Sequence, residues 1–156
     1  MEPAQKPIAN SKPELFPDTV TTYHGSCHCG AVKYEVDLDL NRTKLGKCNC
    51  SICSKIRILG TIVKPDCFRI IQGKDNLTDY QFGTKSSHHT FCKTCGVHPF
   101  GEGFIEQIGG AYVGIAINCL DDVTEEQKDS MFVSYCNDVL SLSLFHSFGN
   151  RIGQSV

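Results

Sequence analysis

The clearest hydrophobic pattern in the chain is a strict alternation over residues 31–37, where charged residues separate Val32, Tyr34 and Val36. Successive side chains of a strand point to opposite faces, so this stretch predicts a β-strand with one face in the core. Less regular stretches rich in apolar, β-branched or aromatic residues predict further strands at residues 19–24, 56–64, 68–72, 77–82 and 111–117. Residues 131–135 and 140–145 close the domain as strands or irregular segments.

The segments between these strands predict one helix and two loops. Asp122 with Glu125 three residues later resembles a capping box and predicts a short helix over residues 123–129. Residues 38–46 are a polar connection, and the glycine-rich residues 101–110 are expected to form a flexible rim or lid. Many short strands with one short helix predict a mainly β fold, with Tyr112 and Phe100 in its core.

Length and composition predict one domain of ordinary type. The chain has 156 residues, of which 40% are hydrophobic and 21% charged, as in soluble globular proteins. Four of its six prolines fall within residues 1–18, which predicts a disordered or surface-draped arm before a domain at residues 19–150. A net charge of −2 argues against nucleic acid as a partner, and no apolar run approaches the ~20 residues that span a bilayer.

The ten cysteines change this picture, because seven of them form three closely spaced groups. Cys27 and Cys29 form a C-x-C pair, residues 48–53 a C-x-C-x-x-C run, and Cys92 and Cys95 a C-x-x-C pair. The start of the chain lacks the apolar core of a secretory signal, so we expect a cytoplasmic location in which thiols stay reduced. An even cysteine count also permits disulfides, but the short spacings favour metal.

The spacing suggests two zinc ions per chain, since zinc is the usual metal of sulfur-only sites. The outer pairs supply a closed four-thiolate site, whereas the middle run supplies only three thiolates. Water, a substrate thiol, Cys67 or a histidine can complete the second site, and an open position is typical of catalytic zinc. Lys47, Lys55 and Arg57 flank this run and either attract an acidic substrate or form a solvated edge.

The remaining cysteines and the histidines near the motifs carry separate predictions. Cys67, Cys119 and Cys136 are expected to be buried thiols. His28 is expected to point outward and His88 to lie on the surface. His89 is a candidate to hydrogen-bond a cysteine sulfur, and His98 either lines the open site or packs.

Residues 25–35, 48–53 and 89–100, in this order, resemble the glutathione-dependent formaldehyde-activating enzyme family over roughly residues 23–120. That family includes the centromere-protein-V-like proteins, to which residues 48–53 are more similar. The resemblance implies an Mss4-like β-tent built around two zinc sites. It assigns a structural zinc to Cys27, Cys29, Cys92 and Cys95, and a catalytic zinc to Cys48, Cys50 and Cys53.

The activity implied by this resemblance is that of a carbon–sulfur lyase that joins glutathione and formaldehyde into S-(hydroxymethyl)glutathione. Two other functions stay open from the residues themselves. The chain can be a non-catalytic, zinc-stabilised binding or scaffold domain, or a lyase or carrier for a different thiol adduct.

Overall fold

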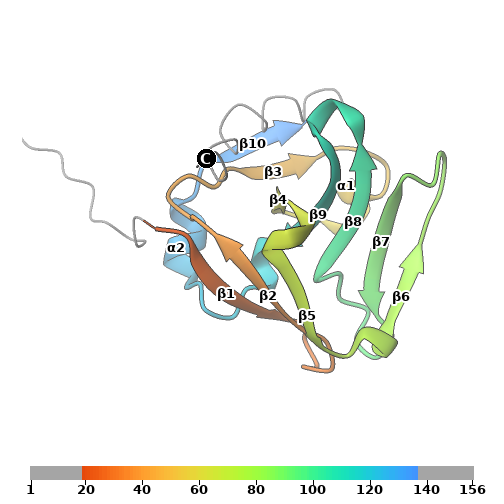
Figure 1. Ribbon diagram of the computed structural model, residues 1–156, viewed down its shortest axis with the longest axis horizontal. Helices are drawn as coiled ribbons and strands as arrows, with labels where there is room; N and C mark the ends of the chain where they lie inside the picture. Colours follow the sequence, from red (N-terminus) through yellow and green to blue (C-terminus); the bar gives the residue numbers. More distant parts are fainter. Residues whose placement is uncertain (1–18, 137–156) are drawn as a thin grey trace, which may run out of the picture.

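The computed structural model describes residues 19–136, which form strands in two sheets with short helices between them (Figure 1). The strands are β1 (Thr21–Ser26), β2 (Lys33–Leu38), β3 (Leu45–Cys48), β4 (Gly60–Val63), β5 (Phe68–Gln72), β6 (Leu77–Tyr80), β7 (Ser87–Cys92), β8 (Phe100–Ile105), β9 (Gly110–Ala116) and β10 (Val133–Cys136). The α-helices are α1 (Cys53–Ile56) and α2 (Glu125–Ser130), and the 3₁₀ turns are η1 (Pro65–Cys67), η2 (Lys74–Asn76), η3 (Glu106–Ile108) and η4 (Ile117–Cys119). The prediction of a mainly β fold is confirmed.

The strands divide into a small sheet and a large one. The small sheet has three strands in the order β1-β2-β5, and the large sheet has seven in the order β10-β3-β4-β9-β8-β7-β6. The pairs are antiparallel except β10 with β3, which run parallel. Residues 19–136 contain no helix with the length and apolar character that crossing a bilayer requires.

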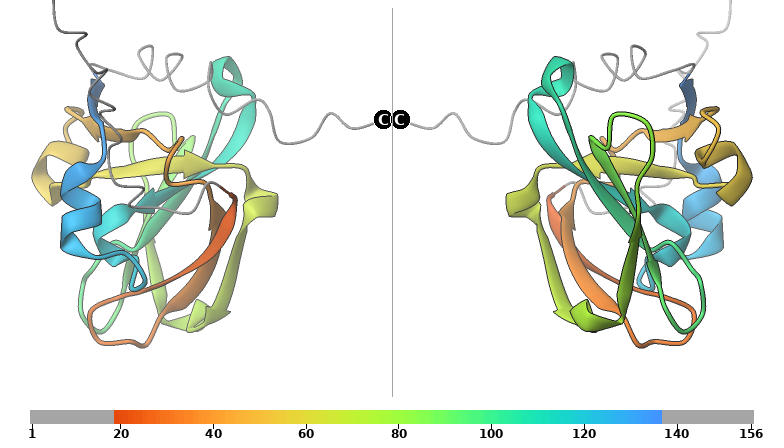
Figure 2. Two further views of the ribbon diagram at one scale, coloured as in Figure 1. Left: turned by 90° about the vertical axis from the view of Figure 1, so that its left-hand side faces the viewer. Right: turned by 90° about the vertical axis from the view of Figure 1, so that its right-hand side faces the viewer.

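The core lies between the two sheets, which face each other in the side views of Figure 2. Val32, Tyr34 and Val36 are at most 1% exposed, so the alternation in the sequence identified the inner face of β2. Tyr34 packs edge-on against Phe100, with ring centroids 5.4 Å apart, and Phe68 packs against both rings. Phe100 therefore lies in the core, as predicted.

The prediction of a flexible rim at residues 101–110 is wrong, because residues 101–105 belong to strand β8, residues 106–108 form η3 and residue 110 begins β9. The glycines serve close packing instead. A Cβ atom at Gly101 would lie 2.7 Å from the carbonyl oxygen of His88 on the neighbouring strand. The absence of a side chain at Gly101 therefore allows β7 to approach β8 closely at this position.

The predicted helix exists, but its N-terminal residues were misidentified. Thr124 is the N-cap of α2: its hydroxyl accepts from the N–H of Gln127, and the Gln127 side chain accepts from the N–H of Thr124. Asp122, which we expected to begin the capping box, instead bonds both the backbone N–H and the Nδ1 of His24.

Two other boundaries also differ from the sequence-based prediction. Residues 56–64 are not one strand, because α1 ends at Ile56 and β4 begins only at Gly60. Residues 38–46 are less polar than expected, since Leu38, Leu40 and Leu45 are all buried and Leu45 begins β3. The expected arm at residues 1–18, the segment 140–145 and the side chain of Cys136 lie outside the described residues.

Candidate metal centres

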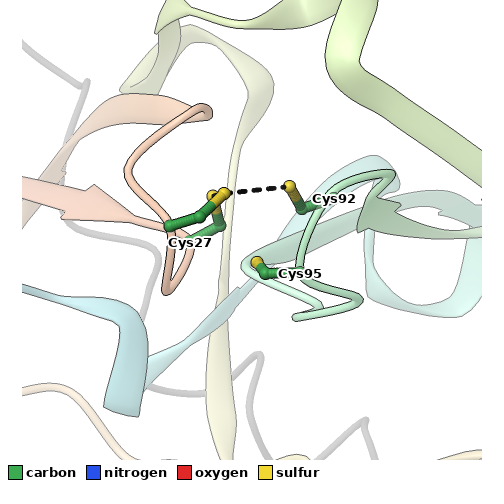
Figure 3. Close-up of side chains that lie close together, drawn as sticks. Cys27, Cys92 and Cys95 are labelled. Carbon is green, nitrogen blue, oxygen red and sulfur yellow. Dashed lines mark hydrogen bonds between the residues drawn. The ribbon is translucent and has the colours of Figure 1, made fainter.

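The two outer cysteine pairs meet in space. Cys27 and Cys29 lie in the turn between β1 and β2, while Cys92 ends β7 and Cys95 lies in the turn that follows (Figure 3). The Cys29 sulfur lies 3.6 Å from that of Cys27 and 3.7 Å from that of Cys92, too far for the ~2.05 Å of a disulfide. All four sulfurs lie within 4.8 Å of one another, so together they can hold a metal ion.

Each pair is shaped by a tight turn with a left-handed glycine. Gly30 donates its N–H to the carbonyl of Cys27 with φ of 75°, and Gly96 donates to the carbonyl of Cys92 with φ of 73°. Glycine adopts this conformation without steric cost, so a C-x-C-G or C-x-x-C-G sequence folds its two thiols toward one point.

Hydrogen-bond donors surround these sulfurs. The N–H of Val32 donates to the sulfur of Cys27 at 3.3 Å, and the side-chain amide of Asn76 donates to that of Cys92 at 3.2 Å. The backbone N–H of Val97 contributes most to lowering the pKa of Cys95 to about 6. These donors favour thiolate, which is the form that binds metal. Sequence reasoning missed Asn76, because nothing in the spacing of η2 relates it to a cysteine 16 positions away.

The middle run forms a second, separate cluster. Cys48 ends β3, Cys53 begins α1, and the N–H of Cys50 donates to the Cys48 sulfur at 3.4 Å. The three sulfurs again lie within 4.8 Å of one another, and all three residues are half-buried. Burial raises the pKa of Cys48 and of Cys53. Burial opposes ionisation of Cys50 too, but N–H donors, Cys53 foremost, lower the pKa of Cys50 overall.

In the described part of the chain, no fourth cysteine, histidine or carboxylate joins this cluster. Cys67, one of the ligands considered, lies instead beside Asp66, with its sulfur 3.8 Å from a carboxylate oxygen. The two clusters therefore differ in kind, one with four sulfurs and the other with three.

The histidines near the motifs have other contacts. His28 is exposed, as predicted. His88 is also exposed, as predicted, and its Nδ1 lies 2.6 Å from Asp79. His89 stacks on Phe82 with centroids 5.5 Å apart, and among the described contacts it makes no hydrogen bond to a cysteine. His98 packs against Phe91 with centroids 5.2 Å apart, and burial lowers the pKa of His98.

The prediction of buried isolated thiols is wrong for the two that the structure describes. Cys67 and Cys119 are only half-buried, since each lies in a short 3₁₀ turn at the end of a strand rather than inside one. Burial is nevertheless sufficient to raise the pKa of Cys119 to about 11.

The flanking cations are all exposed. The Nζ of Lys47 lies 5.6 Å from the ring centroid of Tyr135, and Lys55 lies in the last turn of α1. Arg57 follows that helix in a left-handed conformation with φ of 55°. The segment that carries the three thiols is thus positively charged on its solvent side.

Two comparisons with known proteins agree with this geometry. The chain resembles a crystal structure of a Rhodobacter sphaeroides protein, determined as a structural genomics target, with 31% sequence identity and a TM-score of 0.60. That similarity covers 71% of this chain and 99% of the other. Residues 22–138 match the family model described as glutathione-dependent formaldehyde-activating enzyme. The chain therefore belongs to the glutathione-dependent formaldehyde-activating enzyme family.

Proposed function

We propose that the chain is a zinc-dependent carbon–sulfur lyase that joins glutathione and formaldehyde into S-(hydroxymethyl)glutathione at Cys48, Cys50 and Cys53. One observation carries the proposal: three sulfurs converge at a half-exposed position, and no fourth ligand joins them in the described chain. Four ligands complete a zinc site, so a set of three leaves a position for a substrate. Family membership supports the reaction class.

The donor sets fit zinc. Zinc holds sulfur at about 2.3 Å in a tetrahedron, which separates two ligand sulfurs by about 3.8 Å. The sulfur contacts of 3.6 and 3.7 Å in the four-cysteine cluster agree with this spacing. We assign that cluster to structural zinc, because it connects two distant segments with no ligand position left over.

Zinc bound at the three-cysteine cluster would hold an incoming thiol as thiolate, the form that attacks carbonyl carbon. The chain's own groups favour such a substrate. The N–H groups of Cys53 and Ile52 stabilise negative charge on Cys50. Lys47 and Lys55, exposed beside the cluster, attract the carboxylates of glutathione.

Calorimetric titration of glutathione into the zinc-loaded full chain tests the binding step. In two buffers of different ionisation enthalpy, the heat should differ, because the thiol releases its proton on binding. S-methylglutathione, which has no thiol, is the matched control and should give no buffer-dependent heat. Absence of heat at millimolar glutathione would remove glutathione as the substrate and favour the lyase or carrier for another thiol.

The substitution Cys50→Ser separates the enzyme from a zinc-stabilised scaffold, in which both metals are structural. In the enzyme it should leave the fold intact, lower the zinc content from two ions to one, and abolish the gain in adduct formation. Cys67→Ser, outside both clusters, should change none of these. Because the addition also runs without a catalyst, its rate is best measured by NMR exchange with and without protein. A sharp fall in melting temperature for Cys50→Ser would instead support the scaffold.

A further inference from the structure

Strand β10 brings a cysteine from the far end of the described chain beside the three-cysteine cluster. β10 lies next to β3 and runs parallel to it (Figure 1). The Cα register pairs Val133 with Leu45 and ends by pairing Cys136 with Cys48. Each cysteine is the last residue of its strand, so the two are neighbours where β3 leads into the cluster.

Two contacts fix this register. The N–H of Leu45 donates to the carbonyl of Phe132 at 3.0 Å, one residue before β10 begins. Further along the pair, the Nζ of Lys47 lies 5.6 Å from the ring centroid of Tyr135. A slip by one residue would move the side chains of β10 to the opposite face and break both contacts. The pairing at the end of β10 thus follows from the whole strand.

The two cysteines also share a face of the sheet. Tyr135 and Lys47, the pair before them, are both exposed, the tyrosine to 71%. Successive residues of a strand alternate between faces, so Cys136 and Cys48 occupy the other face together. Neighbouring strands lie about 4.8 Å apart, and a disulfide requires Cα atoms about 4.4–6.8 Å apart. The register therefore places this pair within disulfide range.

Strand β10 can adjust to a bond at this position. It has four residues and is the end strand of the large sheet, and among the described strands it pairs with β3 alone. An end strand shifts at lower cost than a central one, because fewer backbone hydrogen bonds hold it. Cys50 and Cys53, by contrast, lie beyond the end of β3 and have no such partner in the described strands.

We propose that Cys136 and Cys48 form a disulfide, on reaction with glutathione disulfide, that inactivates the three-cysteine site. The inference rests on the proposed function, because the disulfide removes a ligand of the zinc that this function requires. Zinc shares the lone pairs of the thiolates that it binds. Cys136, which is not one of the three proposed ligands, is therefore the thiol beside this cluster that is free to attack.

The exchange takes two steps. The Cys136 thiolate attacks one sulfur of glutathione disulfide, whose S–S bond breaks and releases a first glutathione thiolate. The Cys48 thiolate then attacks the Cys136 sulfur of the mixed disulfide, so the Cys48–Cys136 bond forms and a second glutathione thiolate leaves. Two electrons pass from the cysteines to glutathione disulfide. Solvent takes the proton of Cys136 and protonates both thiolates released. Only Cys50 and Cys53 remain as ligands, too few to retain zinc.

The test is treatment of the zinc-loaded full chain with glutathione disulfide, with released zinc measured by a chromophoric chelator. Wild type should lose one of its two zinc ions and gain a Cys48–Cys136 bond in a non-reducing peptide map. A dithiol reductant with added zinc should reverse both changes. Cys136→Ser should keep both ions under this treatment, and when reduced it should match wild type in zinc content and activity. Cys67→Ser, a half-buried cysteine outside both clusters, is the matched control and should behave as wild type.

Four results would overturn the switch. Wild type may keep both ions in glutathione disulfide, or Cys136→Ser can lose zinc as fast as wild type. A mapped bond between Cys50 and Cys53 would show that the cluster oxidises without Cys136. A low zinc content in reduced Cys136→Ser would make Cys136 a fourth zinc ligand instead of a free thiol. If the disulfide forms but reduced wild type neither binds glutathione nor speeds the addition, the proposed function fails and the disulfide stands.

Discussion

Replacing Cys92 with serine tests the structural role of the four-cysteine cluster most directly. Cys92 is fully buried and ends β7, and its sulfur lies 3.7 Å from that of Cys29, 63 residues earlier in the chain. The serine hydroxyl can still accept the hydrogen bond from the side-chain amide of Asn76. The stability change therefore reports the loss of the thiolate and not the loss of this hydrogen bond.

The expected loss of stability is large. Structural zinc contributes about 10–16 kcal/mol of apparent binding free energy, and losing a quarter of it costs about 2.5–4 kcal/mol. At about 4 °C per kcal/mol for a domain of this size, the melting temperature should fall by about 10–16 °C.

Cys50→Ser is the matched comparison, because the three-cysteine cluster cross-links only the short segment of residues 48–53. The entropy of loop closure grows as the logarithm of loop length. A cross-link over 63 residues therefore restrains the unfolded chain by about 2 kcal/mol more than one from Cys48 to Cys53. The loss for Cys50→Ser should therefore be about 0.5–2 kcal/mol, which lowers the melting temperature by about 2–8 °C.

Thermal unfolding followed by circular dichroism, with zinc measured by mass spectrometry on the same samples, decides the matter. Cys50→Ser should bind one zinc ion, whereas Cys92→Ser keeps three thiolates in its cluster and should hold its second ion more weakly. Only Cys92→Ser should be strongly destabilised. Equal melting shifts for the two variants would refute the division into a structural and an open site, and so would a Cys92→Ser protein with the wild-type melting temperature.

Three further predictions concern the fold around the sites. Gly25→Ala places a Cβ atom 2.2 Å from Cζ of the buried Tyr34, and should cost about 1–3 kcal/mol in urea unfolding; an unchanged midpoint would show that the ring moves freely. Thr124→Ala removes the N-cap of α2 and should cost about 1 kcal/mol by the same assay, whereas no loss would mean that the capping box contributes nothing. Hydrogen bonds from Arg69 lower the pKa of Asp37, so their stabilisation is present above the ordinary pKa of about 3.9 and is lost as pH falls through the lower folded value. In Arg69→Ala the pKa of Asp37 measured by NMR should rise toward about 3.9, and the stability deficit should shrink at acid pH; a pKa that stays low contradicts this.

Features with a local cause were predictable from the sequence. The alternation around Tyr34 reflects the two faces of a single strand, and the cysteine spacings bring neighbouring thiols together within one turn. The C-x-C-x-x-C cluster needs only residues 48–53, so its composition was evident without a fold. The family resemblance rested on these same local motifs and is confirmed.

Features that depend on close approach between strands were not predictable. Gly101 and Gly103 suggested flexibility, because a glycine-rich sequence looks the same whether its backbone is free or pressed against a neighbour. Likewise Thr124 rather than Asp122 caps α2, since Asp122 is already bonded to His24, 98 residues away.

The sequence by itself determined which cysteines could hold metal, where the main strands lie and which family the chain resembles. Only the tertiary structure brought Cys29 to Cys92, supplied Asn76 as a donor, and turned Tyr112 away from the core toward Ser87. The physical reason is that spacing and periodicity act within a few residues. Sheet register, by contrast, decides which side chains from distant strands share a face.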